Sequence, residues 1–393
     1  MKEALGLEDA QARLLALAPL LPSEIIATDA ALGRFLADDI RAARTQPPAD
    51  LSAMDGYALA PGKGVWTLVA ESRAGAPFPG TLGPGTCARI STGAVVPDGA
   101  DRVLLQEDAT RDGDRIIAAE LPPHGRHIRA RGFDFSAGDV LLTRGTQMTA
   151  GRIALALAAG HGTVAVTRRV RVAVMDSGDE LASDPAACLP HQIPASNAAM
   201  IAAMLTPLGC EVMRIGPVPD DSAALAAALA AAEGTDILVT SGGASVGDHD
   251  LIKPALADWG AETAFWRVAI KPGKPLLVAT RGTQVILGLP GNPVSSFVTA
   301  FLFALPLVRG AMGDPNPLPR AVTMLAGEDL PAIGPRREFL RAVSDGDNIR
   351  LAGSQDSSAL SALAQADCLV DRPARSRAVA AGEPVKVFRL GNG

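Results

Sequence analysis

Three short loops rich in glycine, proline and charge lie close together in the second half of the sequence. Residues 241–250 (SGGASVGDHD) combine glycines, which let a backbone approach a ligand closely, with two aspartates. Residues 271–275 (KPGKP) place two lysines three positions apart on a chain stiffened by proline, which suits an oxyanion or a phosphate. Residues 290–293 (PGNP) precede a long apolar segment, so their free backbone amides would face a ligand.

Buried strands are predicted before two of these loops. The apolar runs are residues 237–240 (ILVT) and 285–289 (VILGL). Any one of the loops could be merely a tight connection. Their combination is more specific, because open α/β sheets bind ligands at the carboxyl ends of their strands.

Further carboxylates are expected at the same edge. Residues 176–181 (DSGDEL) follow a predicted strand, and Asp220 and Asp221 follow the next one. Carboxylates held together repel one another unless a cation lies between them, and Mg²⁺ accepts one or two carboxylates together with a ligand phosphate. The alternative is that one of the two aspartates caps the helix predicted from Ser222.

Polar loops also interrupt the first half of the chain. Asp55 stands in MDGYA beside the chain's single tyrosine, where an Asp-Gly turn is an equally good interpretation. Thr92 stands in STGA, and three arginines precede Asp134. His124 and His127 have HxxH spacing, but without partner ligands nearby a solvated loop is the better interpretation.

Composition narrows the class of protein. The chain has 393 residues and a net charge of −6 without a basic tract, which argues against nucleic acid or a membrane surface as the main partner. The N-terminus lacks a basic flank before an apolar core, so we expect a cytoplasmic protein. Residues 294–308 are shorter than a bilayer span and predict a buried helix. The four cysteines have no CxxC pairing, which indicates free thiols.

The order of patterns predicts several domains. Helical spacing over residues 8–21 and an amphipathic segment over 28–40 precede short alternating runs over 65–134, which indicate a small β domain. Residues 138–165 return to the character of the first segment. From residue 169 strands and helices alternate, which predicts a mostly parallel sheet with helices on both faces. Residues 318–393 suit a β-barrel or sandwich.

With these motifs in order, the chain resembles the molybdopterin molybdenumtransferase (MoeA) family, whose eukaryotic relative is the E domain of gephyrin. The resemblance covers nearly the full length and seven motifs. They are MDGYA at 54–58, STGA at 91–94, G-x-D at 132–134, SGDEL at 177–181, SGGASVGDHD at 241–250, IKPGKP at 270–275 and LPGNPVSSF at 289–297.

The resemblance implies an elongated homodimer of α/β and β domains. The expected parts are a discontinuous linking domain (1–42 plus 138–166), an inserted β domain (43–137), a molybdopterin-binding α/β domain (167–312) and a C-terminal β-barrel (313–393). Similar enzymes insert molybdenum from molybdate into the dithiolene of molybdopterin, using adenylylated molybdopterin and Mg²⁺ and releasing AMP. The cleft would lie between the α/β domain of one subunit and the β domain of the other. Contacts with the molybdopterin adenylyltransferase and with recipient molybdoenzymes are also implied.

Site residues follow from matched motif positions and from charge. The catalytic set is Asp55, Thr92, Asp134, Glu180, Asp220, Asp250, Lys271 and Lys274, with Glu180, Asp220 and Asp250 near Mg²⁺. The substrate-binding set is Ser241, Gly242, Gly243, Ser245, Arg267, Pro290, Gly291, Asn292, Pro293, Arg336, Ser357 and Ser358. The chain departs from the family pattern twice, with Arg267 where lysine is frequent and Ser177 where threonine is usual; both replacements retain the charge or the hydroxyl.

Two alternatives remain open at the level of sequence. A non-catalytic scaffold like the gephyrin E domain would release no AMP. A generic Mg²⁺-dependent nucleotide-binding enzyme would bind ATP itself rather than the pterin conjugate.

Overall fold

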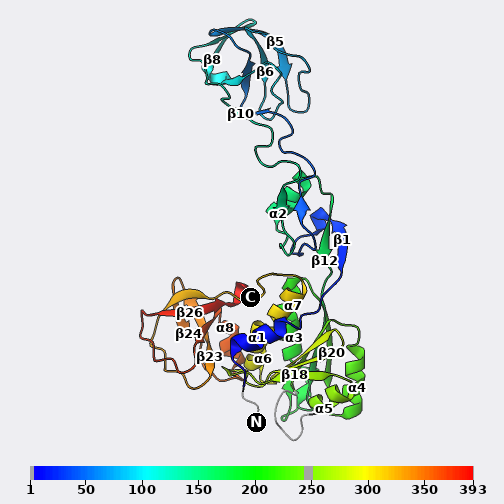
Figure 1. Ribbon diagram of the computed structural model, residues 1–393. Helices are drawn as coiled ribbons and strands as arrows, with labels where there is room; N and C mark the ends of the chain where they lie inside the picture. The colour runs from blue at the N-terminus through cyan, green and yellow to red at the C-terminus, as the bar shows by residue number, and fades with distance from the viewer. Residues whose placement is uncertain (1–3, 243–250, 393) are drawn as a thin grey trace.

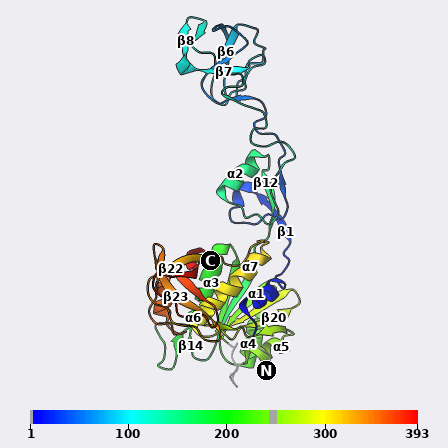
Figure 2. The same ribbon diagram turned by 60° about the vertical axis from the view of Figure 1, so that its left-hand side comes forward.

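The computed structural model describes residues 4–242 and 251–392. The molecule is elongated (Figures 1 and 2): a β domain lies at one end, a small central unit follows, and the α/β domain and a β-barrel lie side by side at the other end. This arrangement confirms the predicted multidomain fold with an α/β domain and a C-terminal barrel.

The central unit is built from chain segments on either side of the β domain. Its strands pair antiparallel across that insertion, β1 (Ser23–Ala27) with β12 (Thr163–Thr167) and β2 (Ile40–Arg41) with β11 (Val140–Leu142). Helix α2 (Ala150–Ala158) packs with a short 3-10 turn (Thr28–Ala30). The rest of the predicted amphipathic segment is irregular, because Gly33 has a φ of 76° and Leu36 donates its amide to Thr146 instead of to a helical neighbour.

The β domain has a six-stranded sheet in the order β7-β4-β6-β5-β9-β8. Buried Trp66 and Tyr57 lie in its core, and the Trp66 indole donates to the carbonyl of Ala60 at 2.7 Å. A small ribbon of β3 and β10 completes the domain. The elements are β3 (Leu51–Ser52), β4 (Gly56–Leu59), β5 (Val65–Ser72), β6 (Thr86–Ile90), β7 (Arg102–Leu105), a 3-10 turn (Gln106–Asp108), β8 (Ala109–Asp112), β9 (Arg115–Ala118) and β10 (Ile128–Arg129).

The α/β domain has a six-stranded sheet in the order β16-β13-β17-β21-β20-β18. β20 pairs antiparallel with both neighbours, and the other pairs are parallel, so β20 alone runs against the rest. The strands are β13 (Arg171–Ser177), β16 (Glu211–Val218), β17 (Ile237–Ser241), β18 (Glu262–Trp266), β20 (Leu277–Arg281) and β21 (Gln284–Leu289).

Helices cover both faces of this sheet, as predicted. One face packs on α3 and the long apolar segment, and the other on α4 and α5. The helices are α3 (Asn197–Leu205) with a 3-10 turn (Thr206–Leu208), α4 (Ser222–Ala231), α5 (Ile252–Asp258), α6 (Pro293–Thr299), a π-helical segment (Ala300–Ala304) and α7 (Leu305–Ala311); β14 (Leu181–Ala182) and β15 (Ile193–Pro194) form a small parallel ribbon. Pro293–Ala311 is long and apolar enough to cross a membrane by composition, but 83% of its apolar window is buried inside the protein, so it is a core helix.

The N-terminal helix α1 (Leu7–Leu15) packs against α7 through Leu7, Ala10 and Leu14, in the core of the α/β domain. The apolar face of α1 is thus buried in the α/β domain and not in the central unit. The predicted domain limits stay a prediction.

The C-terminal barrel closes through β23, which pairs with β24 and with β25. β19 (Ile270–Lys271), from the α/β domain's own chain segment, adds to β23 in parallel. The remaining elements are β22 (Val322–Ala326), β23 (Arg337–Asp345), β24 (Asn348–Leu351), α8 (Leu360–Gln365), β25 (Cys368–Arg372), β26 (Pro384–Arg389) and a 3-10 turn (Leu390–Asn392).

Candidate functional site

A cavity of about 900 Å³ lies at the carboxyl ends of β13, β17 and β21. Nine of the residues predicted for the site line it: Glu180, Asp220, Ser241, Gly242, Pro290, Gly291, Asn292, Pro293 and, from the barrel segment, Ser358. The predicted loops therefore do meet at one edge of the sheet.

The carboxylates that follow β13 and β16 have three different environments. Glu180 and Asp220 are exposed and line the cavity, and the Ser177 hydroxyl donates to Asp220 Oδ1 at 3.2 Å. Asp179 instead accepts the backbone amide of Asp220 at 3.0 Å. Asp221 accepts the amide of Ala224 at 2.9 Å and caps α4, as the alternative interpretation of this pair required.

Asp176, near the end of β13 itself, is 3% exposed. Its Oδ2 accepts the amide of Ala198 at 2.9 Å near the start of α3, whereas its Oδ1 is buried without a hydrogen-bond partner among the described residues. Burial raises the pKa of the Asp176 carboxyl; the bond from Ala198 and attraction to Arg214 oppose that effect. Asp176 therefore anchors the start of α3.

Asn197, which the sequence did not single out, joins two of the predicted loops. Its side-chain amide donates to the Ser241 hydroxyl at 2.9 Å and to the Gly291 carbonyl at 2.7 Å. An asparagine at the first position of a predicted helix is ordinarily a cap, and that signal alone could not distinguish the two roles.

The loop at 290–293 is also tied to the barrel. Asn292 donates to the Ser357 hydroxyl at 3.0 Å, and the Val294 amide donates to the Ser357 carbonyl at 3.1 Å. The neighbouring Ser358 donates its hydroxyl to Asp356 at 2.6 Å, which lowers the pKa of Asp356. Ser357 and Ser358, far from Asn292 in sequence, are thus brought to the cavity rim.

The predicted cations lie beside this cavity and do not line it. Among the described lining residues there is no lysine, arginine or histidine, although Pro275 of KPGKP is one of them. Lys271 Nζ pairs with Glu338 of β23 at 3.2 Å, and Arg336 donates to the carbonyl of Ile270 at 3.4 Å. The Lys274 carbonyl accepts the amide of Val268 at 3.1 Å, and its side chain is exposed.

Arg267 has a different environment from the one predicted. Its guanidinium lies 3.8 Å from the centre of the Trp266 ring, and its backbone has a φ of 75°. Lys253 lies over the same ring at 3.6 Å. Arg267 thus packs on an aromatic face outside the residues that line the cavity.

Asp55 and Thr92 belong to the β domain, at the opposite end of the molecule from the cavity (Figure 1), and Asp134 precedes Phe135, which packs with Ala42 and Ala159 of the central unit. The Thr92 amide donates to Asp55 Oδ1 at 2.8 Å, so two of the three are in contact. The Asp134 amide donates to the carbonyl of Gln46, and its carboxylate is exposed. Within one chain, the structure does not bring these residues to the cavity.

The predicted metal ligands are partly described. Glu180 and Asp220 line one cavity, while Asp250 lies outside the described residues, as do Gly243 and Ser245. Among residues 4–242 and 251–392, no group of three or more His, Cys, Asp or Glu side chains is arranged to hold a metal ion. His124 and His127 belong to no such group.

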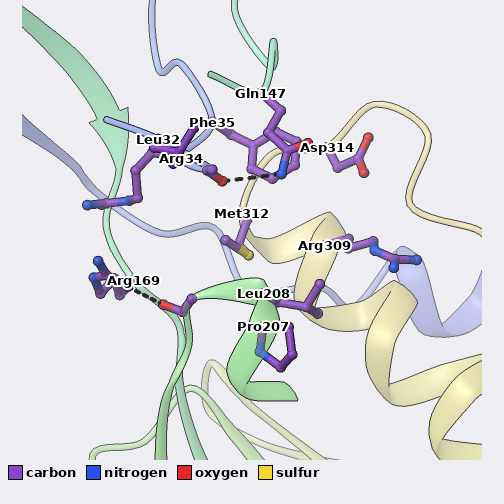
Figure 3. A pocket seen from close by; sticks show the side chains of 12 residues that line it. Leu32, Arg34, Phe35, Gln147, Arg169, Pro207, Leu208, Arg309, Met312 and Asp314 are labelled. Carbon is purple, nitrogen blue, oxygen red and sulfur yellow. Dashed lines mark hydrogen bonds between the residues drawn. The ribbon is translucent and has the colours of Figure 1, made fainter. Parts of the chain in front are cut away.

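A smaller cavity, of about 420 Å³, lies between the central unit and the α/β domain. Leu32 and Phe35 line it from the central unit, and Leu208 and Met312 from the α/β domain. Figure 3 shows Arg169 and Arg309 on opposite sides of it, so these guanidinium groups do not converge on one ligand. None of the predicted site residues lines it.

Comparison with known proteins agrees with this architecture. Residues 5–160 match the MoeA N-terminal region (domain I and II), residues 173–310 a probable molybdopterin binding domain, and residues 323–390 the MoeA C-terminal region (domain IV). The chain is 35% identical to a Nostoc protein named molybdopterin molybdenumtransferase, over 94% of this chain and 89% of that protein. It is 33% identical to a Haemophilus influenzae protein of the same name, over 98% of each.

A solved structure has the same fold over its whole length. The molybdopterin biosynthesis MoeA protein of Pyrococcus horikoshii superposes with a TM-score of 0.84 at 28% identity, covering 99% of each chain. With three matched regions in the expected order and relatives above 30% identity over nearly all residues, the chain belongs to the molybdopterin molybdenumtransferase family, transferases of molybdenum cofactor biosynthesis.

Proposed function

We propose that this chain transfers molybdenum from molybdate to the dithiolene of molybdopterin, using adenylylated molybdopterin and Mg²⁺ and releasing AMP. The observation that carries the proposal is the single cavity that joins two exposed carboxylates, Glu180 and Asp220, to the glycine-bearing turns of β17 and β21. Such a cavity offers oxygen ligands for a hard cation beside backbone that a ligand can approach closely.

The donor set fits Mg²⁺, which prefers oxygen and binds through one or two carboxylates while retaining water. Glu180 and Asp220 would hold it, with Asp250 as a third proposed ligand from the segment outside the described residues. The bound ion would supply charge neutralisation at the phosphoanhydride. Asp179 and Asp221 do not line the cavity, and each accepts a backbone amide, so neither is among the proposed ligands.

Lys271, Lys274 and Arg336 are proposed to bind molybdate beside the acidic cavity. Glu338 holds the Lys271 ammonium in an exposed ion pair, which contributes little to stability. An incoming oxyanion can therefore compete for that ammonium at small energetic cost. In this proposal the chain acts by positioning and by electrostatic neutralisation.

The test is release of AMP from adenylylated molybdopterin in the presence of Mg²⁺ and molybdate, together with molybdenum bound to the product. We expect Lys271→Ala to abolish insertion. Lys386→Ala, the same truncation at an exposed position on β26, should retain it. Full activity in Lys271→Ala would remove the proposed molybdate site, and no AMP from the unaltered chain would favour the scaffold alternative.

We further propose that the working form is a homodimer, with Asp55, Thr92 and Asp134 completing the cavity of the other subunit. The separation of the β domain from the cavity within one chain supports this. So does the exposure of apolar side chains near the central unit, Leu20 at 98%, Ile25 at 76% and Leu32 at 67%.

Subunit mixing tests the shared site. Asp55→Asn and Lys271→Ala should each be inactive alone, whereas a mixed dimer contains one cavity with neither substitution and should regain partial activity. Absence of recovery in dimers shown to have exchanged subunits would contradict a site built from two chains. A cytoplasmic location, and contacts with the adenylyltransferase and with recipient molybdoenzymes, complete the proposal.

A further inference from the structure

The orientation of the Asn197 side chain is fixed by two different acceptors. The Gly291 carbonyl can only accept, so the group 2.7 Å from it must be the NH₂ of the amide. The second hydrogen of that NH₂ meets the Ser241 hydroxyl at 2.9 Å. Both donor hydrogens of Asn197 are therefore used within the protein, and the amide cannot flip without losing both bonds.

The remaining polar atom of this side chain, the carbonyl oxygen Oδ1, is left for a ligand. No described residue donates a hydrogen bond to it, and it is not among the buried polar atoms that lack a partner. Asn197 is half-buried and lines the 900 Å³ cavity. Its Oδ1 is thus an acceptor held at the cavity wall, with no donor among the described residues.

The surrounding wall is also rich in acceptors. Glu180 and Asp220 line the same cavity, and its described lining includes no cationic side chain. A ligand group seated here needs hydrogen-bond donors. Purine and pterin rings with an exocyclic amino group meet that need, since the amino group donates in the plane of the ring.

We propose that Asn197 Oδ1 accepts a hydrogen bond from the exocyclic amino group of an aminoheterocycle bound in this cavity, and so selects amino over oxo rings. The proposal rests on the proposed function, whose substrate contains two such rings, an adenine and a pterin. Asn197 acts in binding, and it also holds the Ser241 and Gly291 turns at a fixed separation.

The test uses two ligand pairs that differ by an amino group replaced with an oxygen. AMP is compared with inosine monophosphate, and pterin with lumazine, by calorimetric titration of the full chain with Mg²⁺. One hydrogen bond of ordinary net strength predicts about fivefold weaker binding of the oxo member of one pair. The pair that shows the difference identifies the ring that contacts Asn197.

Asn197→Ala should reduce the ratio of the affinity for the amino member to the affinity for the oxo member to about one. An unchanged ratio in the variant, equal affinities within both pairs for the unaltered chain, or no binding of any of the four ligands would overturn the inference. If Asn197→Ala does not fold, Asn197→Leu decides, because leucine has nearly the shape of asparagine without the acceptor and should also bring the ratio to about one; an unchanged ratio would again overturn the inference. Molybdenum insertion by the unaltered chain is measured separately, so insertion without discrimination refutes only this inference, and discrimination without insertion refutes only the proposed function.

Discussion

Alanine at Gly242 should disturb the site more than alanine at Gly291, although the two glycines lie on neighbouring loops. Gly242 has a φ of 100°, and a Cβ there would lie 2.8 Å from the Ser177 carbonyl oxygen. At Gly291 the nearest atom to an added Cβ is Gly242 Cα at 3.8 Å, an ordinary contact. The pair therefore separates backbone strain from the mere addition of a methyl group.

The expected loss of stability in Gly242→Ala follows from the backbone conformation and from the close contact at this position. A non-glycine residue in this region costs about 1–3 kcal/mol. Relieving the contact with Ser177 must also separate the ends of β13 and β17, and it weakens the bond from the Gly242 amide to the Leu289 carbonyl, now 3.2 Å. A loss of about 2–3 kcal/mol corresponds to a fall of roughly 5–10 °C in the melting temperature of a domain of this size.

Scanning calorimetry of the full chain measures the shift in the melting temperature of the α/β domain. Titration with AMP in the presence of Mg²⁺ measures the binding affinity of the cavity. We expect Gly242→Ala to melt earlier and to bind more weakly, and Gly291→Ala to melt within about 1–2 °C of the unaltered protein. If both variants melt alike, the described geometry of the Gly242 turn does not govern the stability of this edge.

Three further outcomes are expected. Asp176→Asn should stabilise the protein near neutral pH. The pKa of Asp176 is raised in the folded state, so the stability that this carboxyl provides below its unfolded-state pKa is lost as the pH rises through the folded-state value. Urea unfolding should show the gain from the substitution shrinking toward pH 4 and below, and a gain that is constant with pH would contradict the reasoning. Asp236→Asn should lower the free energy of unfolding by about 2 kcal/mol, since Asp236 accepts two hydrogen bonds from Arg168 (2.6 and 2.7 Å) and one from the Arg171 amide. Burial raises the pKa of Asp236, but these bonds lower it overall. In the same unfolding assay, the difference in stability should therefore persist above pH 4 and fade as the pH drops through the lowered pKa. Cys188 should react first with iodoacetamide at pH 8, because burial raises the pKa of Cys87 to about 11 and those of Cys210 and Cys368 to about 12; peptide mapping in which Cys87 or Cys368 reacts first would contradict the described burial.

The sequence could predict the edge of the sheet but not the partners of each side chain along it. Local pattern placed Glu180, Asp220 and the 290–293 turn at strand ends, since strand and loop alternate within a few residues. It treated Asp176, Asp179 and Glu180 as one acidic group. Their different environments depend on Ala198 and Asp220, which come from other elements, and a carboxylate's hydrogen-bond partners cannot be read from its own loop.

The same limit explains Asn197 and Lys271. Asn197 looks like any helix-initiating asparagine, and its role depends on Ser241 and Gly291, 44 and 94 residues away. Lys271 is predicted to face an oxyanion or a phosphate, but its own motif gives no sign of Glu338, 67 residues later on β23, which pairs with it. Such pairings depend on how the barrel docks, which hydrophobic periodicity does not encode.

The docking of the barrel links the two halves of the proposed site. β19 belongs to the loop that carries Lys271 and Lys274, yet it is hydrogen-bonded as a strand of the barrel's sheet, with Lys271 opposite Glu338. The barrel also holds the 290–293 turn through Ser357, so it contacts both the cationic loop and the wall of the acidic cavity. A rotation of the barrel relative to the α/β domain would therefore change the distance between these two regions, whereas a rotation of the distal β domain would not. The separation of the proposed molybdate residues from Glu180 and Asp220 is thus set by the interface between the α/β domain and the barrel.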